Sequence, residues 1–114
     1  MTFPLYYDRE GRPLDDPMKW AKLFSDPKYK VLQKTETRGA VVSTVWLGLD
    51  HGWGEGPPII FETIVFGGRC DGEMWRYSTE EQARLGHWNA VVMVGRPWWL
   101  RAVMWLFPTL YRKE

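Results

Sequence analysis

The chain has 114 residues, of which 45% are hydrophobic and 25% are charged. These values predict one globular domain with an ordered core and exclude a disordered ground state. A formal net charge of +1 provides no global field for a nucleic-acid polymer. The single cysteine, Cys70, excludes an internal disulfide and a zinc finger. No run reaches the roughly 18 apolar residues that a membrane-spanning helix needs.

The start of the chain predicts a small strand-and-turn unit followed by a short helix. Residues 5–14 predict a strand, a turn at 8–11 and an extended exit. Residues 16–25 predict a helix, because Asp16 can accept from the first backbone N–H groups and Pro17 occupies a position where its missing N–H costs nothing. The helix therefore has a defined beginning in the sequence.

Three strands are predicted next. The dipeptide at 26–27 (Asp-Pro) ends the helix, and residues 29–37 alternate imperfectly between apolar and polar. Arg38 and Gly39 then form a tight connection to 40–49, which like 59–66 is rich in β-branched residues. Because the last two strands contain few charges, we expect them to be central in a sheet.

The clearest local signal is the beginning of a second helix at 79–94. Ser78 and Glu81 have the spacing of a capping box, in which each side chain accepts from the other residue's backbone N–H. Gly95 and a proline two residues later end the helix. The segment before it, 69–77, is polar and predicts a loop.

The last segment, 96–114, differs in composition from the rest of the chain. It contains four basic residues and one acidic residue, so its formal charge is +3, and between 98 and 107 only Arg101 is charged. We expect an apolar, tryptophan-rich helix at 97–107 that packs on the domain or mediates oligomerisation. The apolar residues of this helix cannot all face one small sheet. Those that point away from the domain are the expected homodimer interface: Trp99, Val103, Leu106 and Phe107.

These elements predict one α+β domain over 1–95, with a small antiparallel sheet of three or four strands and helices at about 16–25, 79–94 and 97–107. Membrane association is the less favoured role of the last helix, because a helix that is apolar nearly all round is usually buried in protein.

Four titratable residues are candidates for a metal or acid–base site, but none has the spacing of a metal motif. The simpler reading is structural: Asp50 caps the glycine-rich loop 50–58, and Glu62 pairs with an arginine or lysine across the sheet. We therefore predict no metal and no cofactor. The four candidates are Asp50, His51, Glu62 and His87.

Aromatic and arginine side chains at loops and strand ends are the second candidate site. An aromatic face beside arginine can stack a base and neutralise a phosphate, although core packing and protein interfaces use the same residues. The predicted ligand-binding residues are Trp53, Trp75, Arg69, Arg76, His51 and Tyr77.

The motifs YYDREG, STVWLGLDH, PPIIFETIVFGG and RYSTEEQARLGH are similar to those of a family of short, largely uncharacterised proteins from tailed phages and prophages. The resemblance covers about residues 6–90 and brings no catalytic mechanism. It implies a phage accessory protein that acts in the cytoplasm of the infected host.

The small size, the lack of a catalytic motif and the phage-like pattern predict a non-enzymatic binding protein, and the resemblance implies that it counteracts host antiviral defence. Two mechanisms remain open: sequestration of a nucleotide immune signal, and direct blocking of a host defence protein. A small metal-dependent hydrolase and a virion or assembly component are the alternatives from other classes.

Overall fold

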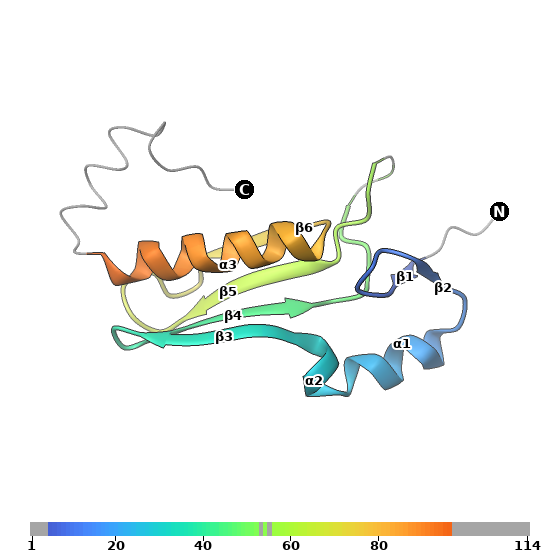
Figure 1. The fold of residues 1–114 in the computed structure, drawn as a ribbon, viewed down its shortest axis with the longest axis horizontal. Helices are drawn as coiled ribbons and strands as arrows, with labels where there is room; N and C mark the ends of the chain where they lie inside the picture. Colours follow the sequence, from blue (N-terminus) through green and yellow to red (C-terminus); the bar gives the residue numbers. More distant parts are fainter. Residues whose placement is uncertain (1–4, 53, 55, 97–114) are drawn as a thin grey trace.

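The larger sheet is a four-stranded antiparallel meander (Figure 1). The computed structural model describes residues 5–52, 54 and 56–96, and the fold in this part of the chain is α+β, as predicted. The strands lie side by side in chain order, and their bounds are β3 (Val31–Thr37), β4 (Ala40–Trp46), β5 (Phe61–Phe66) and β6 (Met74–Tyr77).

The turn between β3 and β4 confirms the predicted tight connection. Arg38 and Gly39 both have positive φ angles, 49° and 76°, as a two-residue type I′ turn requires. Thr37 pairs with Ala40 directly across this turn. The turn therefore fixes the register, and β4 alternates between fully buried and half-buried residues along its length.

The predicted loop at 69–77 is wrong in its second half, because its last four residues form β6. Trp75 pairs with Thr63 and Tyr77 with Phe61 in the ladder to β5. Among the strands that the structure describes, β6 is an edge of the sheet. A strand of four residues carries little periodicity of its own, which is why the polar composition was misleading.

A long helix, α3 (Glu80–Gly95), packs across one face of this sheet (Figure 1). Its buried residues include Ala83, His87 and Ala90. The predicted capping box is wrong by one residue: Thr79 accepts from the Gln82 N–H at 3.1 Å, and the Gln82 side chain accepts from Thr79 at 3.2 Å. The Gln82 side chain also accepts from the Ser78 N–H at 3.1 Å. The observed capping box therefore satisfies one more backbone N–H than the predicted one would.

The N-terminal part of the chain forms a separate small unit at one end of the sheet (Figure 1). Its elements are β1 (Tyr6–Tyr7), β2 (Pro13–Leu14), α1 (Pro17–Phe24) and α2 (Pro27–Lys30). The helix predicted at 16–25 is confirmed, with Asp16 accepting from the Met18 N–H at 2.9 Å.

The strand predicted at 29–37 begins two residues late. Asp26 caps the short helix α2 by accepting from the Lys28 N–H at 3.0 Å. The Asp-Pro pair therefore ends one helix and begins another, since an N-cap followed by proline at the first helical position is itself a start signal.

Aromatic side chains join this unit to the sheet. The Trp46 side chain is fully buried, and its indole N–H donates to the Tyr7 carbonyl at 3.0 Å. Trp20 donates in the same way to the Leu47 carbonyl at 2.9 Å, and the Tyr29 ring meets Trp46 edge-on at 4.9 Å. Both indoles thus combine apolar burial with a satisfied donor.

Some predicted features lie outside the described residues, so the structure does not describe them. These are the helix at 97–107, the interface residues Trp99, Val103, Leu106 and Phe107, and the loop residue Trp53. In the part of the chain that the structure describes, no helix is long and apolar enough to cross a membrane.

Candidate binding cleft and polar ladder

A cleft of about 290 Å³ opens between β6 and the first half of α3. Among the described residues, its lining contains one arginine, no carboxylate and several neutral groups that can donate or accept a hydrogen bond. From the sheet side it is lined by Ile59, Arg76, Tyr77 and Ser78, and from the helix by Gln82, Leu85, Gly86 and Asn89. A second hollow, of about 410 Å³, is lined among the described residues by 36–41 of the β3–β4 hairpin, so no described element outside the hairpin closes it.

Arg76 supplies the positive charge of the cleft, and part of this charge is already compensated. Its Nε donates at 3.0 Å to the carboxylate of Glu62, which pairs with Arg76 in the ladder between β5 and β6. The Glu62 side chain is 10% exposed, whereas that of Arg76 is 40% exposed. The predicted pairing of Glu62 across the sheet is therefore confirmed, and the guanidinium remains accessible to solvent.

Tyr77 links the cleft to the interior of the protein. Its side chain is 5% exposed, and the hydroxyl donates to Thr63 Oγ1 at 3.1 Å. Gly86 of α3 lies directly against the Tyr77 ring, where a Cβ atom would overlap the hydroxyl. The absence of a side chain at Gly86 thus lets helix and strand approach closely.

From Tyr77 a ladder of hydrogen bonds crosses the sheet beneath α3. Thr63 bonds to Thr44, and the Thr44 hydroxyl lies 2.8 Å from His87 Nδ1. The other ring nitrogen, Nε2, lies 2.9 Å from the Thr35 hydroxyl. The polar ladder (Thr35, His87, Thr44, Thr63 and Tyr77) therefore connects all four strands of the large sheet to the helix.

His87 is neutral in this setting. The side chain is fully buried, and burial lowers the pKa of the imidazole to about 4. One run of donors satisfies the ladder: Tyr77 donates to Thr63, Thr63 to Thr44, Thr44 to Nδ1, and Nε2–H to Thr35. A second ring proton would sit on Nδ1, which then could no longer accept from the Thr44 hydroxyl. Protonation of His87 would therefore also break the ladder at Thr44.

The structure does not assemble the four metal or acid–base candidates into one site. His87 lies in the ladder and Glu62 in its ion pair, while Asp50 accepts from the Gly52 and Ile59 N–H groups at 2.8 and 2.9 Å. Asp50 thus caps its loop, as expected. Among the described residues, no three histidine, cysteine or acidic side chains form a group that could hold a metal ion.

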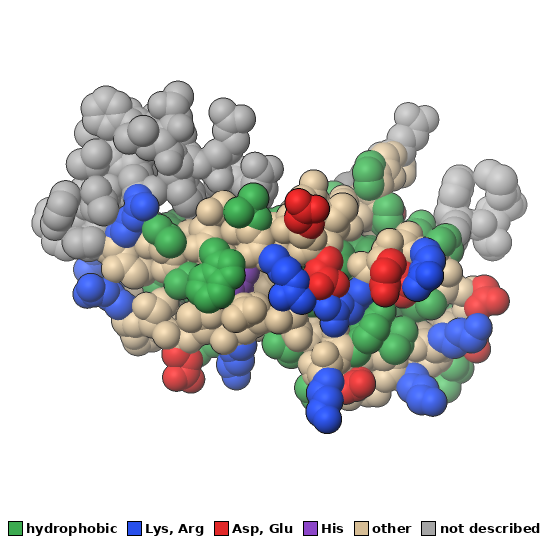
Figure 2. Space-filling view, in the orientation of Figure 1, with side chains coloured by type: hydrophobic (Ala, Val, Ile, Leu, Met, Phe, Trp, Pro, Cys, Tyr) green, Lys and Arg blue, Asp and Glu red, His purple; other side chains and the backbone are tan. Residues whose placement is uncertain are grey.

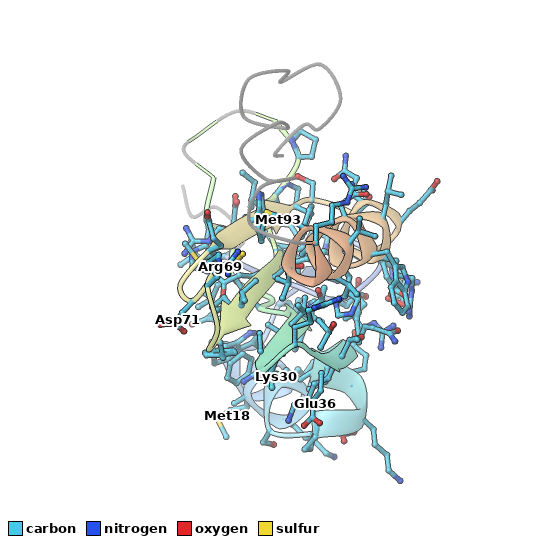
Figure 3. All side chains as sticks on the ribbon, turned by 90° about the vertical axis from the view of Figure 1, so that its left-hand side faces the viewer. Met18, Lys30, Glu36, Arg69, Asp71 and Met93 are labelled. Atoms are coloured by element: carbon cyan, nitrogen blue, oxygen red, sulfur yellow. The ribbon has the colours of Figure 1, made fainter. Side chains whose placement is uncertain are left out.

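Of the six predicted ligand-binding residues, the structure brings Arg76 and Tyr77 to one cleft. Trp75 is 5% exposed and belongs to the core, because successive residues of a strand point to opposite faces. Arg69 is exposed in the β5–β6 connection, before the start of β6 (Figure 3). The cleft lies next to the other end of β6, at Tyr77. The His51 side chain is exposed, and its backbone N–H donates to Ile59 at 2.9 Å, beside the cleft.

The sequence interpretation missed the helical wall of the cleft. Gln82, Gly86 and Asn89 recur at spacings of four and three residues, which places them on one side of a helix. That signal was present in the sequence. The sequence interpretation did not identify β6, the strand that this side of the helix faces.

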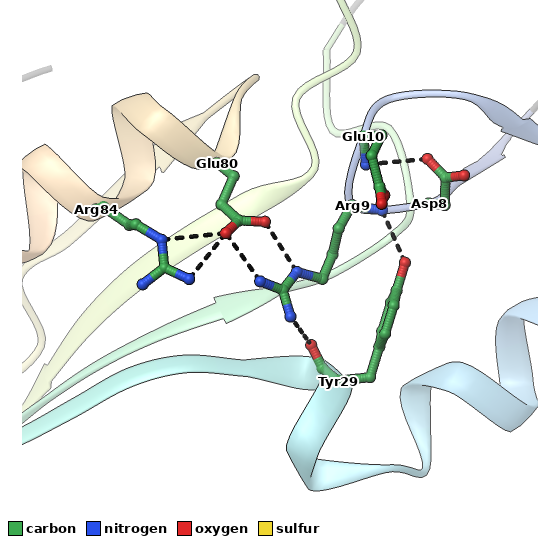
Figure 4. Close-up of polar contacts among 6 residues, drawn as sticks. All are labelled: Asp8, Arg9, Glu10, Tyr29, Glu80 and Arg84. Carbon is green, nitrogen blue, oxygen red and sulfur yellow. Dashed lines mark hydrogen bonds and ion pairs between the residues drawn. The ribbon is translucent and has the colours of Figure 1, made fainter.

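An ion-pair cluster at the beginning of α3 was also missed (Figure 4). Arg9 binds the Glu80 carboxylate with Nε at 3.0 Å and Nη2 at 2.8 Å, and Arg84 binds the same group at 2.8 Å. Arg9 also donates to the Tyr29 carbonyl at 3.2 Å. Hydrogen bonding from Arg9 lowers the pKa of Glu80, so the cluster ties the N-terminal unit to the helix through a stably ionised carboxylate.

No protein-family model and no solved structure matches the chain. A curated protein, the 4-dedimethylamino-4-oxo-anhydrotetracycline transaminase OxyQ from Streptomyces rimosus, is 28% identical over 105 residues. The match covers 76% of this chain and 29% of that protein. Because the chain spans less than a third of the transaminase's length, the similarity does not assign that activity here.

Proposed function

We propose that the protein is a non-enzymatic binding protein that takes an anionic, nucleotide-type small molecule in the β6–α3 cleft. The observation that carries the proposal is the lining, in which Arg76 is accompanied by Ser78, Gln82 and Asn89 and, within the part of the chain that the structure describes, by no carboxylate. Arginine suits phosphate, and side-chain amides can pair with the edge of a base. A volume of about 290 Å³ is at the lower end of small-molecule sites.

The biological setting of this proposal comes from the sequence motifs. Their resemblance to phage and prophage proteins favours a role inside an infected bacterium, where a sequestered nucleotide would be an immune signal of the host. A protein that only binds needs no general acid or base at the ligand. The described lining of the cleft, which holds one arginine and no carboxylate, is compatible with such a role.

Calorimetric titration of the full chain with mononucleotides and with linear and cyclic dinucleotides tests the proposal. Arg76→Gln should weaken binding about 10-fold, equivalent to about 1.4 kcal/mol. Glu62→Gln should strengthen it severalfold, because the carboxylate that now compensates Arg76 would be neutral. Arg69→Gln is the matched control, since it removes an exposed arginine away from the cleft.

The proposal is wrong if no nucleotide binds, or if Arg69→Gln weakens binding as much as Arg76→Gln. Chromatography of the nucleotide after incubation separates binding from turnover, because a sequestering protein returns its ligand unchanged. Thermal melting of each variant confirms that the loss of affinity is not a loss of fold.

A second candidate, direct blocking of a host defence protein, is favoured by the sheet face opposite α3. Phe66 and Met74 are 53% and 42% exposed there, and both adjoin Ile64. Exposed apolar side chains of this size are typical anchors of protein interfaces. Capture of a bacterial protein by the wild-type chain, abolished by Phe66→Lys and unaffected by Arg76→Gln, would favour this candidate over nucleotide binding.

A further inference from the structure

An apolar stripe on the outer surface of α3, which borders the β6–α3 cleft at Leu85, is largely exposed in the part of the chain that the structure describes. Leu85, Trp88 and Val92 are 66%, 50% and 45% exposed. They are separated by three and four residues, so they share one side of the helix, away from the buried Ala83 and Ala90. Figure 2 shows hydrophobic side chains along this outer surface. We call Leu85, Trp88 and Val92 the α3 stripe.

We propose that the α3 stripe is the docking site of the chain's own C-terminal segment, residues 97–114, which folds back along the helix. The first argument is reach. The stripe spans eight residues of α3, 85–92, or about 10 Å at a rise of 1.5 Å per residue, and ends four residues before Arg96. The eighteen residues after Arg96 would extend about 27 Å even as a helix, which is enough after a short reversing turn.

The second argument is chemical. Between 98 and 107 the segment contains eight large apolar residues and one charge, at Arg101. An apolar run of this kind is usually covered in a monomeric protein. The exposed side chains of the α3 stripe form an apolar surface next to the residue from which the segment leaves the helix. Each therefore supplies the cover that the other lacks.

The third argument is charge. A segment that folds back along α3 brings its basic residues Arg112 and Lys113 beside the beginning of the helix, where Glu81 is exposed on the same side as the stripe. The exposed sheet face opposite α3 offers no such preference, because Lys34 and Glu36, the exposed residues of β3 that alternate with Thr35, balance each other there. Charge complementarity thus favours the helix over the sheet.

The chain's own segment is also favoured over a second copy. It is tethered at Arg96, next to the stripe, so its effective concentration there is in the millimolar range expected for short linkers. A second copy would have to exceed this value before it displaced the tethered segment. Docking within one chain therefore predicts a monomer at micromolar concentration.

Hydrogen exchange of the full chain, followed by mass spectrometry of peptides from 97–114, tests the proposal. We expect these peptides to be protected in the wild type. Val92→Lys and Trp88→Lys, each of which places a charge on the stripe, should accelerate their exchange at least 10-fold. Met18→Lys on α1, 73% exposed in the wild type, is the matched control and should leave the exchange unchanged.

Three results would overturn the proposal. Absence of protection in the wild type would mean that the segment docks nowhere, and loss of protection in Phe66→Lys but not in Val92→Lys would place it on the sheet. A mass of two chains by light scattering, lost in Val92→Lys, would assign the stripe to a second copy. Unchanged exchange of β4 and β5 peptides shows that a variant is folded, and Val92→Lys keeps the test available if Trp88→Lys unfolds.

Discussion

The helix α3 is held to the rest of the chain at two places that use opposite chemistry. Beneath its middle, His87 joins the polar ladder through neutral, buried hydrogen bonds to Thr35 and Thr44. At its beginning, Glu80 forms ion pairs with Arg9 and Arg84, whose side chains are 20% and 47% exposed. The first attachment is shielded from water and the second is in contact with it.

This difference determines how much each attachment contributes to stability. When a buried hydrogen bond is broken, the remaining partner stays without water, and the free energy of unfolding falls by about 1–3 kcal/mol. When an exposed ion pair is broken, water and salt replace it, and the loss is typically below about 1 kcal/mol. The four predictions below separate the two attachments.

The largest effect is expected for His87→Ala. The variant removes the hydrogen bonds to Thr35 and Thr44 and leaves a cavity under α3, so the free energy of unfolding should fall by about 4 kcal/mol. Urea unfolding at pH 7 followed by circular dichroism measures it. A loss below about 1 kcal/mol would mean that the ladder contributes little to holding the helix.

Acid should weaken the same attachment by about 3 kcal/mol. The folded state holds the pKa of His87 at about 4, below the ordinary value of 6.5, so the unfolded chain binds the proton more readily. The stability contribution is therefore complete above pH 6.5 and is lost as the pH falls towards 4. Urea unfolding midpoints of the wild type and of His87→Gln across this pH range isolate the contribution of His87 protonation to stability, because glutamine does not titrate.

Gly86→Ala is expected to cost about 2 kcal/mol, because the new Cβ would overlap the Tyr77 ring at the end of the ladder. Gly95→Ala is the matched control on the same helix, where a Cβ would meet Thr37 at an ordinary 3.8 Å. The control should change the stability by less than about 0.5 kcal/mol. Equal effects of the two variants would contradict the close packing at Gly86.

The smallest effect is expected at the ion-pair cluster. Arg9→Gln should lower the free energy of unfolding by at most about 1 kcal/mol in dilute buffer, and the difference from wild type should shrink in 1 M NaCl. Arg12→Gln, at a side chain that is 73% exposed, should have almost no effect. A loss for Arg9→Gln that persists in 1 M NaCl would show that this attachment is not mainly electrostatic.

Elements with a strong local signal could be predicted from the sequence. The Asp16 cap defined α1, and the turn at Arg38 and Gly39 defined the hairpin. Where two local signals compete, the local pattern did not decide between them: the capping box lies one residue later than predicted, and the pair at 26–27 both ends α1 and begins α2. β6 was missed because four residues show almost no periodicity and depend on pairing with β5.

The candidate site was less predictable than the fold. Residues close in sequence, such as Trp75 and Arg76, were expected to act together, but strand alternation buries the first and exposes the second. The wall formed by Gln82 and Asn89 could not be assigned to a site without knowing which strand the helix faces. Proximity in sequence is a poor guide to proximity in space where a strand passes the site.

By itself, the sequence determined the α+β class, the antiparallel hairpin and the beginning of α1, because backbone capping, turn geometry and apolar spacing act over a few residues. Only the tertiary structure decided that His87 is a neutral member of a ladder and that Arg76 and Tyr77 share a cleft with α3. The physical reason is that burial and hydrogen-bond partners are set by residues distant in the chain: Thr35 and Thr44 lie 52 and 43 positions from His87.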